Sequence, residues 1–155
     1  MVSFNNIIGH EEIIRHLKNA MTTGKISHSY IFTGRPGSGK KLLATTYAMT
    51  LQCEAGGTEP CQKCDSCKKA IGKNHPDIIM VNHEKPGTIT IDEVRDQVIH
   101  DVDIRPYYSP YKIYIIADAD MMTPQAQNAL LKTIEAADQQ CGCSASYDPV
   151  TVCKT

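Results

Sequence analysis

A glycine-rich loop that joins an apolar segment to a helical pattern constrains the fold of this chain more than any other feature. The loop, Gly34–Lys41, reads GRPGSGKK and matches the pattern G-x-x-x-x-G-K. It follows the apolar run Tyr30–Thr33 and opens a helix that we expect over Lys40–Leu51, which is the context that a phosphate-binding loop requires. Glycines let backbone amides converge on phosphate oxygens, and the helix start adds a favourable dipole. The loop therefore predicts a nucleotide-binding site made by Gly34, Gly37, Ser38, Gly39, Lys40 and Lys41.

The eighth position of the loop departs from the pattern of an active ATPase. A Ser or Thr hydroxyl normally binds Mg²⁺ there, whereas this chain has Lys41. Lysine has no acceptor oxygen, and its positive charge repels a divalent cation. We therefore expect that ATP or ADP can bind through Lys40, while Mg²⁺ is disfavoured and hydrolysis is impaired.

Four of the seven cysteines lie within a segment, residues 53–74, that has no hydrophobic periodicity. Four thiolates complete the tetrahedral shell of a structural Zn²⁺ and leave no position for water. The chain has neither an apolar signal core at its N-terminus nor an apolar run of membrane-spanning length, so we expect a cytoplasmic protein. In that compartment such cysteines bind metal rather than form disulfides. The segment is therefore predicted to be an inserted zinc module with the ligands Cys53, Cys61, Cys64 and Cys67.

Alternatives exist for the residues of this segment. The spacing C-x2-C-x2-C also occurs in iron–sulfur proteins, but the continuation C-x3-C-P does not follow Cys67. His75 is a possible substitute ligand, although four cysteines suffice and we expect a loop histidine. Lysines around the segment could contact nucleic-acid phosphates. Without aromatic partners among them we expect a solvated face formed by Lys63, Lys68, Lys69 and Lys73.

The rest of the chain alternates between apolar runs and helical patterns. Thr90 and Glu93 form a capping box, and Thr123 followed by Pro124 is a helix start. The alternation predicts an α/β fold with a mainly parallel sheet, in the three-layer arrangement of P-loop NTPases. We expect strands at 30–33, 77–81 and 112–117, and helices at 9–24, 40–51, 90–102 and 123–134. The first helix is expected to bury Ile13, Ile14, Leu17, Ala20 and Met21.

Several segments, taken with the loop and the cysteine insertion, resemble one family over about residues 4–135. The segments are Phe4–Gly9, His28–Gly34, His75–Asp77 and Asn128–Glu135. They are similar to the bacterial DNA polymerase III clamp-loader subunits of the delta-prime type, which have an AAA+ fold. In that family the first segment lies near the adenine pocket. Related loader subunits that hydrolyse ATP share the loop and the zinc module, but normally keep the hydroxyl and the acidic residues.

The resemblance also locates a second defect. Where the AAA+ pattern has two apolar residues followed by Asp and Glu, this chain has Ala117 and Asp118 at the end of the third strand. One alignment puts Ala117 in place of the Asp that holds Mg²⁺ and Asp118 in place of the catalytic Glu. A shifted alignment makes Asp118 the metal ligand but puts Ala119 in the catalytic place. Either alignment lacks one acid, so we expect a degenerate acidic motif and assign no catalytic residue.

The resemblance implies a role in DNA replication. Such subunits sit in a five-membered ring that opens the sliding clamp and places it on primed DNA, and many delta-prime subunits do not hydrolyse ATP. We therefore expect a non-hydrolysing or weakly hydrolysing subunit of the DNA polymerase III holoenzyme. Its partners are the other clamp-loader subunits and, through the complex, the clamp and primed DNA, with no membrane contact. The alternatives are an active clamp-loader-type ATPase and a zinc-dependent nucleic-acid-binding protein, although a net charge of −1 argues against the whole molecule attracting nucleic acid.

The last part of the chain departs from the family. We expect an AAA+ nucleotide-binding-like domain at 1–137 and a divergent tail at 138–155, whose origin in truncation, frameshift or faulty gene prediction the sequence leaves open. The family's strand order, 5-1-4-3-2, requires a strand between the first and third strands. The β-prone run Val150–Cys153 could fill this gap. If it does not, the residues from Asp138 onward are expected to be loose.

Overall fold

The computed structural model describes residues 2–82, 87–140 and 148–154. Its centre is a four-stranded parallel sheet with the order β1-β4-β3-β2. The strands are β1 (Ser29–Phe32), β2 (Ile78–Val81), β3 (Tyr111–Ile116) and β4 (Asp148–Lys154). The α/β fold with a parallel sheet is therefore confirmed, and the order agrees with the 1-4-3-2 part of the arrangement that the resemblance implied.

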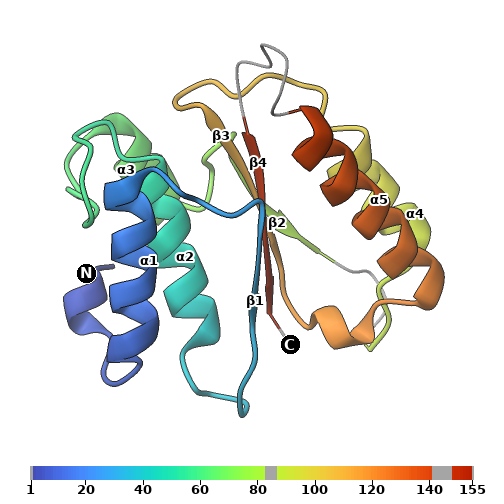
Figure 1. Cartoon of the computed structure of the whole chain (residues 1–155), viewed down its shortest axis with the longest axis horizontal. Helices are drawn as coiled ribbons and strands as arrows, with labels where there is room; N and C mark the ends of the chain where they lie inside the picture. The colour runs from blue at the N-terminus through green and yellow to red at the C-terminus, as the bar shows by residue number, and fades with distance from the viewer. Residues whose placement is uncertain (1, 83–86, 141–147, 155) are drawn as a thin grey trace.

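Helices lie on both sides of this sheet (Figure 1). One side carries α1 (Glu11–Thr23), α2 (Lys40–Leu51) and α3 (Asp65–Ile71), and the other carries α4 (Ile91–Val94) and α5 (Pro124–Gln140). Three short turns complete the described elements: η1 (Phe4–Asn6), η2 (Arg95–Ile99) and η3 (Ala119–Met121). Among the described helices, none combines the length and the apolar character needed to cross a bilayer.

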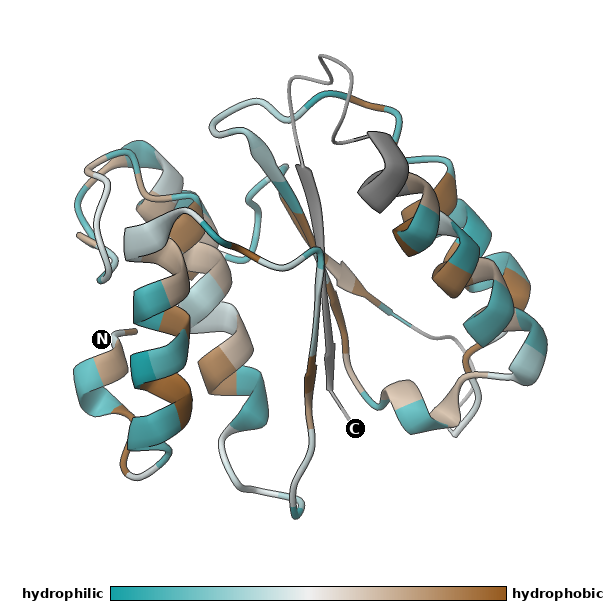
Figure 2. Ribbon diagram, in the orientation of Figure 1, coloured by the Kyte–Doolittle hydropathy of each residue, from teal (hydrophilic) through white to brown (hydrophobic). Residues whose placement is uncertain are grey.

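The strand β3 joins two apolar clusters because successive side chains of a strand point to opposite faces. Ile113 and Ile115 belong to the cluster on the α1 and α2 side, whereas Tyr114 and Ile116 belong to the cluster on the α4 and α5 side. All four are buried, as expected for a strand covered on both faces. Figure 2 shows apolar residues on the strands β1, β2 and β3 and on the side of α5 that faces the sheet. The first cluster also contains Phe4, Leu17, Phe32, Leu43 and Tyr47, and the second Val81, Ile89, Val94, Val98 and Leu130.

The strand β4 fills the gap between β1 and β3. Val152 pairs with Tyr30 of β1 on one side and with Ile115 of β3 on the other. Of the two alternatives left open for the run Val150–Cys153, the structure shows the one in which it enters the sheet. Because β4 has a strand on each side, the inner edges of β1 and β3 both have a backbone partner.

The buried face of α1 differs from the predicted one at a single position. Leu17 and Ala20 are buried, and Ile14 and Met21 are half-buried against the same cluster. Ile13, which we expected in this face, is 41% exposed. The helix is turned so that Leu17 is at the centre of the contact, which leaves Ile13 at its margin.

The predicted helix 90–102 begins as expected and then changes its hydrogen bonding. Thr90 and Glu93 form the capping box, which is confirmed in both of its hydrogen bonds. After Val94 the chain widens into the π-helical turn η2, in which the amide of His100 donates to the carbonyl of Arg95 over 2.9 Å. Val98 stays buried in this wider turn, so the helix keeps its apolar side on the sheet.

The position of β4 predicts a large effect of proline at residue 152. The change Val152→Pro removes an amide donor from a strand that is paired on both sides, and we expect the free energy of unfolding to fall by about 3 kcal/mol. Urea denaturation measures this loss, and Val152→Thr, which keeps the amide and a β-branched side chain, serves as the control. Slow amide exchange at residues 151 and 152 of the unmodified protein should accompany it. Fast exchange there in a folded protein would contradict the pairing.

Candidate nucleotide loop and metal centre

The glycine loop connects the end of β1 to the start of α2 at the carboxyl edge of the parallel sheet. Gly37 and Gly39 have φ angles of 80° and 83°, which a side chain strongly disfavours. Gly39 is the N-cap of α2. The loop therefore has the strand-loop-helix geometry in which backbone amides at a helix start can receive phosphate oxygens.

The side chain of Lys40 lies in the curve of this loop. Its ammonium group donates hydrogen bonds to the carbonyl oxygens of Gly34 and, at 3.0 Å, of Arg35. Only 8% of the residue is exposed. A Cβ atom on Gly34 would approach Ser38 Oγ to 3.2 Å, so the loop is closely packed. The charged donor and the helix start fit the chemistry of a phosphate group, which would replace the two carbonyl acceptors around the ammonium group.

His10 was missed as a loop contact by the sequence analysis. Its Nε2 atom lies 2.8 Å from the carbonyl oxygen of Ser38, and because a carbonyl only accepts, Nε2 carries the hydrogen. His10 is also the N-cap of α1, in the left-handed conformation with φ 60°. The contact therefore connects the segment before α1 to the loop. A lone histidine after Gly9 offers no sequence signal for it.

The residues of the predicted acidic motif, Ala117 and Asp118, lie at the same edge of the sheet as the loop. β3 ends at Ile116, Ala117 follows, and Asp118 is the N-cap of η3 with an exposed side chain. In the register of the sheet, Phe32 of β1 and Ile116 of β3 pair with consecutive residues of β4. Ala117 offers no side-chain oxygen at this edge, and the exposed ammonium group of Lys41 offers none at the start of α2. The residues present therefore fit phosphate better than Mg²⁺.

The four cysteines of the insertion converge on one point. Their sulfur atoms all lie within 4.8 Å of one another, and Cys61 and Cys67 are 4.0 Å apart. Tetrahedral Zn²⁺ with Zn–S bonds of 2.3 Å requires sulfur–sulfur distances of about 3.8 Å. Cys53 and Cys67 are buried, whereas Cys61 and Cys64 are half-buried. The four sulfurs therefore fit a closed structural zinc site with little adjustment.

Backbone amides point at these sulfurs. The amides of Cys61, Cys64 and Cys67 donate to the sulfurs of Cys53, Cys61 and Cys64 over 3.3–3.4 Å. The amides of Cys64 and Lys63 lower the pKa of Cys61 to about 6. Burial raises the pKa of Cys53 and of Cys67. A metal cation binds deprotonated sulfurs, so it would offset the burial that disfavours the thiolates of Cys53 and Cys67.

The loop and the cysteines lie at opposite ends of α2. The helix has 12 residues, a length of about 18 Å, and runs from Lys40 to Leu51, two residues before Cys53. A metal held by the cysteines is thus far from a phosphate held by the loop. The metal centre is suited to a structural role and not to a reaction at the loop.

His75 is engaged in hydrogen bonds that the sequence did not indicate. It is buried, its Nδ1 atom accepts from the amide of Asp77 at 3.0 Å, and its Nε2 atom lies 2.8 Å from Ser66 Oγ. Burial lowers its pKa and favours the neutral ring. Among the described residues, the group that could hold a metal consists of the four cysteines and does not include His75.

The lysines around the module divide into two sets. Lys69 forms an ion pair with Asp65 at 3.0 Å and contacts Tyr108 through both its hydroxyl and its ring. It therefore belongs to the packing of α3. Lys63, Lys68 and Lys73 are exposed, as the sequence predicted for a solvated face.

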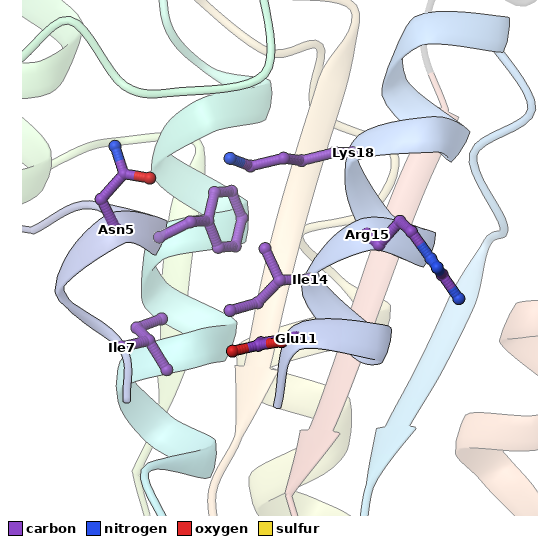
Figure 3. A pocket seen from close by; sticks show the side chains of 7 residues that line it. Asn5, Ile7, Glu11, Ile14, Arg15 and Lys18 are labelled. Atoms are coloured by element: carbon purple, nitrogen blue, oxygen red, sulfur yellow. The ribbon is translucent and has the colours of Figure 1, made fainter. Parts of the chain in front are cut away.

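A pocket of about 420 Å³ lies between η1 and α1 (Figure 3). Its floor is apolar, and charged side chains of α1 form its rim. Lys18 at the rim is held by Glu59 of the cysteine segment, at 2.5 Å. The pocket is part of the segment that resembles the adenine-pocket region, but its lining comes from outside the glycine loop: Phe4, Asn5, Ile7, Glu11, Ile14, Arg15 and Lys18.

Comparisons with known proteins agree with this geometry. A sequence profile of the family described as DNA polymerase III, delta subunit, matches residues 9–141. The DNA polymerase III subunit tau of Bacillus subtilis (strain 168) is 36% identical over 139 residues, which cover 89% of this chain and 24% of the relative. The subunit delta' of the same organism is 35% identical over 124 residues, covering 79% of this chain and 37% of the relative.

A solved structure shares the fold. The gamma-subunit-related protein of Thermotoga maritima superposes with a TM-score of 0.53 at 20% identity, over 94% of this chain and 38% of that protein. The chain thus spans less than two-fifths of the length of each of these relatives. The profile match covers most of the sequence, and it confirms the resemblance that the loop and the cysteine insertion predicted: this chain belongs to the DNA polymerase III delta-subunit family.

Proposed function

We propose that this chain is the AAA+ nucleotide-binding-like part of a delta-prime-type clamp-loader subunit that binds ATP or ADP but does not hydrolyse it efficiently. Family membership and relatives named as DNA polymerase III subunits tau and delta' support the assignment to the replicative polymerase. One observation supports the loss of hydrolysis. The carboxyl edge of the sheet keeps the phosphate-binding ammonium group of Lys40 but has no metal-binding oxygen at Lys41 or Ala117.

Nucleotide binding in this proposal depends on the loop and the start of α2. Lys40 exchanges its bonds to the carbonyls of Gly34 and Arg35 for bonds to phosphate oxygens. His10 holds the loop through the Ser38 carbonyl, so the loop keeps its curvature while this exchange takes place. The nucleotide itself supplies the phosphate charge, and the chain supplies its binding and orientation.

Hydrolysis fails in this proposal because the reaction needs a divalent cation to neutralise the charge that develops on the phosphates. Lys41 puts a positive charge where a hydroxyl would bind that cation. Ala117 removes a carboxylate from the end of β3. Asp118 remains at the edge, but its exposed position at the start of η3 gives one acidic group where two are needed.

The same proposal assigns a structural Zn²⁺ to Cys53, Cys61, Cys64 and Cys67. The converging sulfurs and the amides that point at them support this assignment. The bound ion would cross-link the chain after α2 to α3 and so stabilise the insertion. It would take no part in chemistry at the loop.

The other clamp-loader subunits are the proposed partners, and the sliding clamp and primed DNA are reached through the complex. Residues 1–137 would form the AAA+-like domain, and the tail, 138–155, would complete its sheet by contributing β4. In this role the chain acts as a rigid structural component of the polymerase holoenzyme. Turnover of nucleotide would come from other subunits.

The degenerate site predicts nucleotide binding without appreciable turnover. We expect ATP hydrolysis by the purified chain to remain well below about 1 s⁻¹, the low end of typical enzyme rates. Equilibrium binding of ATP should be lost in Lys40→Ala, the matched control. The double change Lys41→Thr with Ala117→Asp should strengthen binding of Mg²⁺-ATP relative to metal-free ATP. A turnover near 1 s⁻¹ by the unmodified chain would instead identify an active ATPase.

The cysteine geometry predicts about one Zn²⁺ per chain by elemental analysis. We expect Cys64→Ser to release the ion and to lower the melting temperature, because one of four ligands is lost. Gln62→Ser lies in the same turn, removes no sulfur and should retain the metal. An unchanged melting temperature after exhaustive chelation would refute a structural zinc.

A further inference from the structure

A buried chain of polar groups runs beside the cysteine cluster. Ser66 is fully buried in the first turn of α3, between Cys64 and Cys67. Its hydroxyl donates to the backbone carbonyl of Gln52 over 2.7 Å. The same oxygen lies 2.8 Å from Nε2 of His75. Three segments of the chain, the end of α2, the start of α3 and the segment before β2, therefore meet at one hydroxyl group.

The directions of these hydrogen bonds follow from the chemistry of the groups. The amide of Asp77 donates to His75 Nδ1, so the hydrogen of the neutral ring is on Nε2. His75 Nε2 then donates to Ser66 Oγ, which leaves the hydroxyl hydrogen for the carbonyl of Gln52. Each donor in the chain has one acceptor. The chain is thus complete, as a buried polar network must be to stabilise a fold.

The ends of this chain flank the two buried sulfurs. Gln52 directly precedes Cys53, and Ser66 directly precedes Cys67. The amide of Ser66 also donates to the carboxylate of Glu54 over 3.1 Å, one residue beyond Cys53. The two arms of the cysteine cluster are therefore tied together by protein hydrogen bonds on either side of Cys53.

We propose that Ser66 and His75 are positioning residues of the metal centre, which hold the arms bearing Cys53 and Cys67 at coordination distance and anchor them to the start of β2. The inference rests on the proposed zinc site and adds the hydrogen bonds that hold its ligands in place. Groups around a metal that fix its ligands typically change metal affinity by 10–100-fold when they are removed. His75 acts here through Ser66 and contacts no sulfur.

A second set of hydrogen bonds connects the same region to the loop before β3. The carboxylate of Asp77, which is fully buried, accepts from the amides of Tyr107 and Tyr108 over 2.8–2.9 Å. The hydroxyl of Tyr108 in turn donates to Asp65 of α3 over 3.1 Å. Through His75 and Asp77, the metal centre is connected to the beginning of β2 and to the loop before β3.

Zinc affinity tests the positioning role directly. Ser66→Ala and His75→Ala keep all four cysteines, and each should weaken Zn²⁺ binding by about 10–100-fold in a competition titration with a chromogenic chelator. Thr50→Ala is the matched control. It removes a buried hydroxyl near the module that bonds only within α2, to the carbonyl of Thr46 at 2.7 Å, and should leave the affinity within about threefold.

A double-variant cycle separates positioning from general destabilisation. If Ser66 and His75 act through one hydrogen bond, the double variant should lose little more affinity than the weaker-binding single variant. His75→Gln, which can still donate to Ser66, should recover part of the affinity. Losses that simply add, with no recovery by glutamine, would overturn the proposal.

Amide exchange on the unmodified protein gives an independent readout that needs no variant. Chelation of the zinc should speed exchange at residues 77, 107 and 108 and leave α5 unchanged. A wild-type protein without zinc would refute the proposed metal site. A protein that binds zinc, but whose Ser66 and His75 variants bind it equally well and whose exchange ignores chelation, would refute the positioning role alone.

Discussion

Backbone pairing of β4 on both sides is the interaction on which the rest of the molecule depends. β1 carries the glycine loop, and β3 leads into the acidic motif. The two strands are not neighbours, so their ends share one edge only because β4 lies between them in parallel register. Without that strand, two rows of backbone donors and acceptors would be unpaired in the middle of the sheet, which is costly for a domain of ordinary stability. The geometry of the candidate nucleotide site thus depends on the presence of β4 between β1 and β3.

The helix α2 connects the glycine loop to the cysteine module and fixes where the module begins. Its start is fixed by Gly39 and Lys40 at the loop, and its side chains Leu43 and Tyr47 are buried against the sheet. The chain leaves its far end directly at Gln52 and Cys53. The rigid helix therefore sets the position of Cys53, and the hydrogen bonds of Ser66 with Gln52 and His75 connect α3, which carries Cys67, to the same region. The module is an extension of the core and not an independent appendage.

Local patterns were predictable from the sequence, whereas contacts between distant segments were not. The glycine loop, the capping box of Thr90 and the convergence of the cysteines each depend on residues close together in the chain. The hydrogen bonds of His10, Ser66 and Asp77 reach partners that lie 28, 9 and 30 positions away in the sequence. No periodicity or spacing in the sequence predicts such pairs. The exposure of Ile13 was missed for a related reason, because the exact rotation of a helix is set by what it packs against.

The glycine loop keeps its shape through contacts within the chain. Lys40 finds acceptors within the loop, at the carbonyls of Gly34 and Arg35, so its buried charge is satisfied by the protein itself. His10 adds a hydrogen bond that also comes from the chain. The conformation of the loop is therefore supported by the protein's own contacts, and the sheet, the core and α2 form with Lys41 and Ala117 at these positions. The contacts that build this edge of the sheet do not require a hydroxyl at position 41 or a carboxylate at position 117, which is the physical condition for the proposed subunit that binds a nucleotide but hydrolyses it poorly.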